Sequence, residues 1–157
     1  MQDDQMHKRQ VQNYEIQDEQ EESRVGADAE GYIMLTDYLA FDQRKNLGAV
    51  VSKEKQKSGT IGDAKKAVLE YKICGVHEDK VMFDILLHTG RHHQIRLQMA
   101  NAGYPLVGDQ KYGESQGKEQ LALCSYFIEF EHPETKKRMS FSIKPKNELF
   151  RGVMCEQ

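Results

Sequence analysis

Apolar and polar residues alternate most clearly in the second half of the chain. Residues 67–73 and 80–87 are two β-rich runs, and the short polar segment between them is typical of a hairpin connection. Two further strand-like runs follow at residues 121–130 and 139–143, and the turn between them contains Pro133. The pattern therefore predicts two antiparallel hairpins.

Between these hairpins the spacing of apolar residues changes to that of a helix. Ile95, Met99 and Ala102 recur three or four positions apart, and Gly103 is well placed to end the helix in a left-handed conformation. Thr89 is the expected amino-terminal cap. The order strand, strand, helix, strand, strand predicts the α+β class, with a largely antiparallel mixed sheet and a short helix after the central hairpin.

The beginning of the chain differs in composition from the rest. Residues 1–30 are rich in Gln, Glu and Asp and lack apolar periodicity, which predicts an acidic leader of low order. Residues 31–147 are expected to form one domain, and residues 148–157 a tail. Within the domain, residues 42–63 are polar and turn-rich, which favours an exposed hairpin or loop.

Composition narrows the class of protein. Hydrophobic residues make up 38% of the chain and charged residues 30%, as in polar globular proteins. No apolar run approaches the roughly 20 residues that a membrane span needs, and the amino terminus lacks the apolar region of a signal peptide. Cys74, Cys124 and Cys155 lie far apart without metal-ligand spacing, which predicts reduced thiols in a cytoplasmic protein.

The net charge of −3 neither supports nor excludes a nucleic-acid partner, since RNA binding needs only local positive potential. The helix start is unusual, because helices favour acids there and this one has Arg91, His92 and His93. Either these residues and Arg96 hold an anion, or they point into solvent. A metal site that includes His88 is less favoured, because no acidic or thiol ligand stands nearby, and we expect no metal.

Two blocks of residues around this helix form a long composite motif. The first is residues 89–96, TGRHHQIR, and the second is residues 103–113, GYPLVGDQKYG. In order and spacing they resemble the signature of the RluA-type RNA pseudouridine synthases. Residues 64–71 and 121–133 resemble the segments that flank this signature. As a whole the resemblance covers residues 31–147. These enzymes convert uridine in ribosomal or transfer RNA to pseudouridine. The resemblance implies structured rRNA or tRNA as the partner, half of the catalytic fold of these enzymes, and no metal or organic cofactor.

The resemblance also implies roles for single residues. Arg96 is similar to the active-site arginine that pairs with the catalytic aspartate and helps to hold the target nucleotide; an exposed ion pair is the plainer alternative. Another acid already paired with Arg96 would contradict the expectation that its guanidinium awaits a carboxylate from another segment. His93 and Gln94 are expected to tie the helix start to the neighbouring strand, and Asp109 to form a turn. The residues expected to contact RNA are Gly90, Arg91, His92, Lys111 and Tyr112. For Tyr112 packing is expected to be the main role.

The sequence departs from the family at its nucleophile. In the family this is an aspartate in a His-Arg-Leu-Asp block upstream of these motifs, and the 157 residues contain no such block. The family also uses a tyrosine soon after the nucleophile. Tyr14 is the only positional candidate for it, but the residues around Tyr14 do not match the family pattern. Loss of a nucleophile commonly costs several powers of ten in rate.

Two explanations of this departure stay open. In the first, the chain is an incomplete pseudouridine synthase, inactive alone, with exposed apolar surface that binds the missing amino-terminal half or a second copy. In the second, it is a non-catalytic RNA-binding protein derived from the family.

Overall fold

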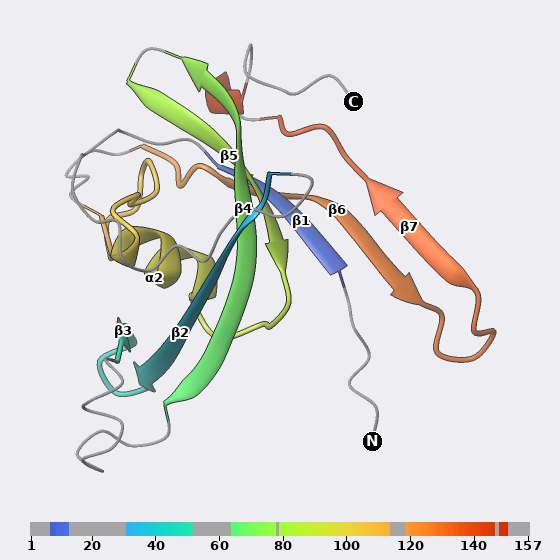
Figure 1. Ribbon diagram of the computed structural model, residues 1–157, viewed down its shortest axis with the longest axis horizontal. Coiled ribbons are helices and arrows are strands. Elements are labelled where there is room, and N and C mark those ends of the chain that lie inside the picture. Colours follow the sequence, from blue (N-terminus) through green and yellow to red (C-terminus); the bar gives the residue numbers. More distant parts are fainter. Residues whose placement is uncertain are drawn as a thin grey trace.

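The computed structural model describes residues 7–12, 31–51, 64–77, 79–113, 119–146 and 148–150. These residues form a curled antiparallel sheet with α2 against one face (Figure 1). No helix in these ranges is long and apolar enough to cross a membrane. In chain order the elements are β1 (His7–Gln12), β2 (Ile33–Asp42), β3 (Leu47–Val50), β4 (Lys65–His77), β5 (Lys80–Leu87), α2 (Gln94–Asn101), β6 (Leu123–Glu131), β7 (Arg138–Ser142) and the 3-10 helix η1 (Glu148–Phe150).

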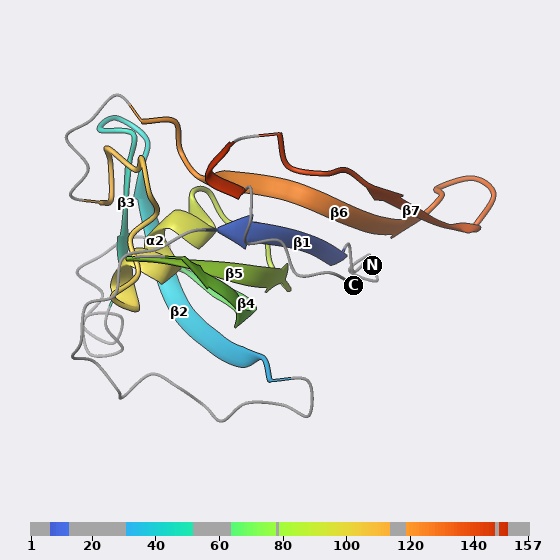
Figure 2. The same ribbon diagram turned by 90° about the horizontal axis from the view of Figure 1, so that it is seen from above.

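The sheet has seven strands in the order β3-β2-β4-β5-β1-β6-β7, and every neighbouring pair is antiparallel. The two predicted hairpins are β4–β5 and β6–β7. The predicted α+β class, with a short helix after the central hairpin, is confirmed. Residues 42–50 form a turn and strand β3, as expected for a hairpin, and residues 52–63 lie outside the described residues. Seen from above, β6 and β7 extend away from α2 (Figure 2).

Strand β1 corrects the expectation for the beginning of the chain. It lies between β5 and β6 and pairs with both, with Val11 opposite Asp84 on one side and Cys124 on the other. The predicted low order is therefore wrong for His7–Gln12. A strand inside an antiparallel sheet satisfies its backbone N–H and C=O groups on both sides, and this pairing does not require apolar periodicity. Residues 1–6 and 13–30, Tyr14 among them, lie outside the described residues.

The main core lies between the sheet and α2. Leu69, Phe83 and Ile85 of the central strands are fully buried, and Ile95 and Met99 of α2 pack against them. Burial of each such side chain contributes about 1.5–3 kcal/mol to stability. This packing fixes α2 on the sheet, and with it the position of the polar side chains that the helix carries.

A smaller cluster joins the end of the chain to β5. Phe150 is only 2% exposed and packs with Met82 and Ala122. The prediction of a tail is therefore wrong for Glu148–Phe150. Burial of the Phe150 ring stabilises the folded chain, and this fixes the segment against β5. Residues 151–157 lie outside the described residues. Among the described residues the most exposed large apolar side chains are Ile73, Val76, Phe141 and Ile143, at 51–62%, and the binding of a missing half or a second copy stays a prediction.

The helix ends as predicted. The N–H of Tyr104 donates to the carbonyl of Met99 (2.9 Å), and that of Gly103 donates to the carbonyl of Ala100 (3.1 Å). Gly103 has a φ of +84°, in the left-handed region. These two bonds and this conformation make a Schellman cap, which turns the chain sharply into the second motif block.

The helix begins later than predicted. Gln94 is its first residue and His93, with a φ of +53°, is the N-cap without a side-chain capping bond. Thr89 is therefore not the cap; its hydroxyl lies 2.8 Å from Oε1 of Gln94 and donates to it. The φ of Gly90, which lies just before the helix, is not positive. The residue that adopts the left-handed backbone conformation before the helix is His93.

Candidate functional site

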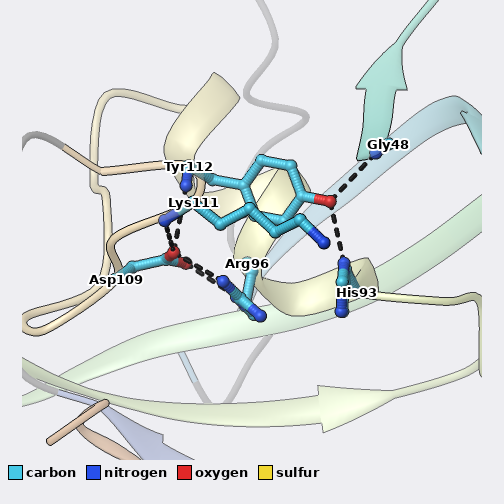
Figure 3. Close-up of polar contacts among 6 residues, drawn as sticks. All are labelled: Gly48, His93, Arg96, Asp109, Lys111 and Tyr112. Carbon is cyan, nitrogen blue, oxygen red and sulfur yellow. Dashed lines mark hydrogen bonds and ion pairs between the residues drawn. The ribbon is translucent and has the colours of Figure 1, made fainter. Parts of the chain in front are cut away.

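The two motif blocks meet at the start of α2. The helix presents Arg96, and the loop after it returns to place Asp109, Lys111 and Tyr112 beside it (Figure 3). Strand β3 closes the group through Gly48. The contact between the blocks follows from the Schellman cap and from the tight turn at residues 106–109, because both reverse the direction of the chain.

Arg96 and Asp109 form a forked ion pair. Nε of Arg96 donates to Oδ2 of Asp109 (2.8 Å), and Nη2 donates to Oδ1 (2.7 Å). The Arg96 side chain is 19% exposed and that of Asp109 only 1%. Charge-assisted bidentate pairs of this kind are about twice as strong as neutral hydrogen bonds.

The electrostatics keep Asp109 ionised. Burial raises the pKa of Asp109, but hydrogen bonds from Arg96 and from the backbone N–H groups of Tyr112 and Lys111 outweigh it, so that the pKa lies below its usual value. The hydrogen bond to Asp109 in turn raises the pKa of Arg96, more than burial lowers it. Both groups are therefore charged at neutral pH.

This pair corrects the expectation for Arg96. We expected it to await a carboxylate from another polypeptide segment, and that is wrong, because Asp109 is its partner within the described part of the chain. Asp109 also forms a turn as predicted, since its Oδ1 accepts the N–H groups of Lys111 (2.9 Å) and Tyr112 (3.0 Å). The pair uses two of the five N–H donors of the guanidinium, and Nη1 makes no hydrogen bond within the described residues.

Tyr112 connects three parts of the site. Its hydroxyl accepts the N–H of Gly48 (2.9 Å) and lies 2.8 Å from Nδ1 of His93, and its ring centroid is 5.0 Å from Cζ of Arg96. Burial lowers the pKa of His93, and the nearby charges of Arg96, His92 and Lys111 lower it further. Neutral His93 can then accept the hydroxyl hydrogen of Tyr112. These contacts are the packing role expected for Tyr112.

Gln94 fastens the loop before the helix to β4. Its Nε2 donates to the carbonyl of Val68 (3.1 Å), and its Oε1 accepts the N–H of Arg91 (2.9 Å) as well as the hydroxyl of Thr89. The predicted structural role of Gln94 is confirmed. Nε of Arg91 donates to the carbonyl of Lys66 (2.9 Å), while the rest of this exposed side chain faces solvent.

The other candidates surround this centre. Gly90 and His92 are exposed, and Lys111 is half-buried with Nζ 5.9 Å from the Tyr112 ring centroid. His88 contacts Glu70 instead, with Nε2 3.1 Å from Oε1. Sequence reasoning did not find Gly48, which contributes only a backbone N–H to the site. Because Gly48 lies 64 residues from Tyr112, no local pattern could have indicated this contact.

Comparison with known proteins shows which sequences this chain is similar to. Over 80 residues the chain is 38% identical to "Uncharacterized RNA pseudouridine synthase YjbO" of Bacillus subtilis, a match that covers 50% of this chain and 28% of that protein. Over 103 residues it is 35% identical to the ribosomal large subunit pseudouridine synthase D of Pseudomonas aeruginosa, which covers 56% of this chain and 32% of that protein. The chain is related to the RluA-type RNA pseudouridine synthases.

The RluA-type likeness extends to the fold. The solved structure of Human RNA Pseudouridylate Synthase Domain Containing 1 matches 90% of this chain and 55% of its own length, with a TM-score of 0.63 and 17% identity. At this identity the match concerns the fold alone. The chain thus matches about a third of the length of its RluA-type sequence relatives and about half of this structure. No protein-family model matches the chain.

Proposed function

We propose that this chain forms part of the catalytic domain of an RNA pseudouridine synthase that modifies rRNA or tRNA in the cytoplasm. The observation that carries the proposal is the meeting of the two motif blocks at Arg96, in a chain whose sequence relatives are RNA pseudouridine synthases. A buried ion pair fixes the guanidinium there and leaves Nη1 for a ligand. In this proposal the arrangement binds the substrate but lacks the nucleophile that catalysis needs.

In this proposal the residues divide into two groups. Nη1 of Arg96 contacts the target nucleotide, while Asp109 and Tyr112 hold the guanidinium in place. Arg91, His92 and Lys111 face the RNA, and the charged side chains of Arg91 and Lys111 contact phosphates. Gly90 is exposed and has no side chain, so the RNA can come close to the protein backbone there. Phosphate contacts of this kind position the RNA without reading its sequence.

The reaction also needs a carboxylate from a His-Arg-Leu-Asp segment, which the 157 residues do not contain. In the proposed reaction the uridine leaves its stack and the carboxylate assists cleavage of the bond between C1′ and N1. The uracil turns, C5 bonds to C1′, C5 loses its hydrogen and N1 gains one. The reaction is an isomerisation, so it needs no other reactant. By itself the chain is expected to bind RNA without converting it.

The RNA partner can be tested by salt titration. Replacement of Arg91 with alanine is expected to weaken binding to a structured tRNA transcript. It should also reduce the slope of log affinity against log salt by about one, because one phosphate contact is lost. Fluorescence anisotropy over a range of salt concentrations measures both. Little loss of stability is expected, since Arg91 is exposed.

Arg138→Ala is the matched control. Arg138 is as exposed as Arg91, but it lies on β7 and pairs with Glu129, so its charge is already neutralised. We expect its salt slope to equal that of the unmodified chain. No binding by the unmodified chain at low salt would contradict the RNA partner. Equal slopes for all three proteins would contradict the contact by Arg91. RNA binding that never leads to isomerisation, even with the missing segment supplied, would favour the non-catalytic alternative.

A further inference from the structure

Four aromatic rings are in contact beside the proposed site. The ring of Phe41, from the end of β2, lies 4.0 Å from that of His92 and 5.8 Å from that of His93 between centroids. The two histidine rings are 4.2 Å apart, and His93 meets Tyr112 edge-on at 5.4 Å. The series therefore runs from the buried side of the site at Tyr112 outward to His92.

The outer end of this series is open to solvent. Phe41 is half-buried and His92 is exposed, and neither packs into the apolar clusters that hold the sheet and α2 together. The contact between Phe41 and His92 is thus not part of the core, although it brings together segments 51 residues apart in the chain. The two rings are tilted by 52° to each other, so each ring by itself can offer a flat face to a ligand.

The surroundings of this face carry positive charge. Arg91 directly precedes His92 in the chain, is exposed, and donates from Nε to the backbone carbonyl of Lys66. On the inner side stand Arg96 and Lys111, and their charges contribute to the lowered pKa of His93, after burial. Two acids stand near these groups: Asp42, which follows Phe41 and accepts the backbone N–H groups of Arg44 and Lys45, and Asp109, which is paired with Arg96. A ligand with a planar aromatic face and a negative charge would complement both features.

We propose that Phe41 and His92 form a stacking platform for an unpaired base of RNA, with Arg91 on the adjacent phosphate. Unpaired bases are recognised in this way because their flat faces are free, whereas the bases of a duplex are already stacked on each other. The inference rests on the proposed function and adds to it a preference for single-stranded RNA next to the target site. Phe41 lies outside both motif blocks.

The test compares single-stranded with double-stranded RNA. Fluorescence anisotropy is measured with a short labelled oligouridylate and with a blunt RNA duplex of equal length, for Phe41→Leu, His92→Ala and the unmodified chain. Each substitution is expected to weaken oligouridylate binding about tenfold and to leave duplex binding unchanged, as for the loss of one stacked base. The salt slope should not change, because no phosphate contact is removed.

Phe141→Leu is the matched control, since Phe141 is also a partly exposed ring in contact with another ring, but on β7. It is expected to bind like the unmodified chain. If Phe41→Leu does not fold by circular dichroism, His92→Ala decides, because His92 is exposed. Unchanged oligouridylate binding by the variants, or an equal loss for the duplex, would overturn the platform and leave the proposed function standing. Failure of the unmodified chain to bind either RNA would overturn both.

Discussion

Replacement of Asp109 with alanine is expected to lower the free energy of unfolding by about 3 kcal/mol, the low end for breaking a buried ion pair, because the Arg96 that is left without its partner is partly exposed. Asp109 is 1% exposed and accepts four hydrogen bonds, two from Arg96 and one each from the N–H groups of Lys111 and Tyr112. Its loss would free the guanidinium and open the turn. Urea denaturation followed by circular dichroism measures the effect.

A double-mutant cycle separates the ion pair from the turn. Arg96→Ala alone leaves the carboxylate of Asp109 buried without its cation, so it is also expected to be strongly destabilising. The double variant should be clearly more stable than the sum of the two single effects predicts, since neither charge is then left alone. Additive effects would mean that the two residues do not interact in solution, contrary to the geometry.

The same pair predicts how stability depends on pH. Because the folded-state pKa of Asp109 is lowered, its contribution is complete above the pKa of an unfolded aspartate, about 3.9. The contribution is lost as the pH falls further, through the lower pKa of the folded state. In the Asp109→Asn variant, the loss of stability that comes from protonation of Asp109 should be absent. An unchanged loss of stability below about pH 4 in this variant would show that Asp109 is not ionised preferentially in the folded chain.

Gly108→Ala is expected to be the other large effect, with a loss of about 2–5 kcal/mol, from left-handed strain and overpacking together. Gly108 has a φ of +74°, and a Cβ there would lie 2.4 Å from the carbonyl oxygen and 2.7 Å from the carbonyl carbon of Gln120. Both are backbone atoms, which cannot move aside as a flexible side chain could. The strain would fall on the turn that positions Asp109.

Two other glycines provide graded controls for thermal or urea denaturation. Gly103 has a φ of +84°, but a Cβ there meets nothing within 4 Å, so Gly103→Ala should lose only the cost of the left-handed conformation, about 1–2 kcal/mol. Gly90 has neither feature, and Gly90→Ala should be close to neutral. A Gly108→Ala variant as stable as Gly103→Ala would show that the turn relaxes away from Gln120.

The parts of the fold that follow from local pattern were predictable. The hairpins β4–β5 and β6–β7 show as β-rich runs around polar turns, and Gly103 marks the end of α2. Strand β1 was not predictable, because its residues HKRQVQ carry no apolar pattern and its place depends on backbone pairing with β5 and β6. The start of α2 was misplaced because Thr89, a good capping residue, bonds to Gln94 and Val68 instead.

The sequence predicted some of the residues of the candidate site, but not how they contact one another. The motif blocks indicated Arg96, Lys111 and Tyr112, but not that Asp109 would occupy the guanidinium. That contact depends on two chain reversals between residues 96 and 109, whose combined geometry no spacing rule provides. Phe41 and Gly48 reach the site from the β2–β3 hairpin, far away in the sequence, so only the sheet topology reveals them.

Pseudouridine formation is the measurement that tests the central claim most directly. Tritium release from RNA labelled at C5 of uridine would be followed with this chain alone, with an amino-terminal segment that carries a His-Arg-Leu-Asp block alone, and with both together. Release is expected only from the mixture, because the proposed RNA contacts around Arg96 and the carboxylate lie on different polypeptides. Release by this chain alone, or none from a mixture shown to bind RNA, would contradict the claim.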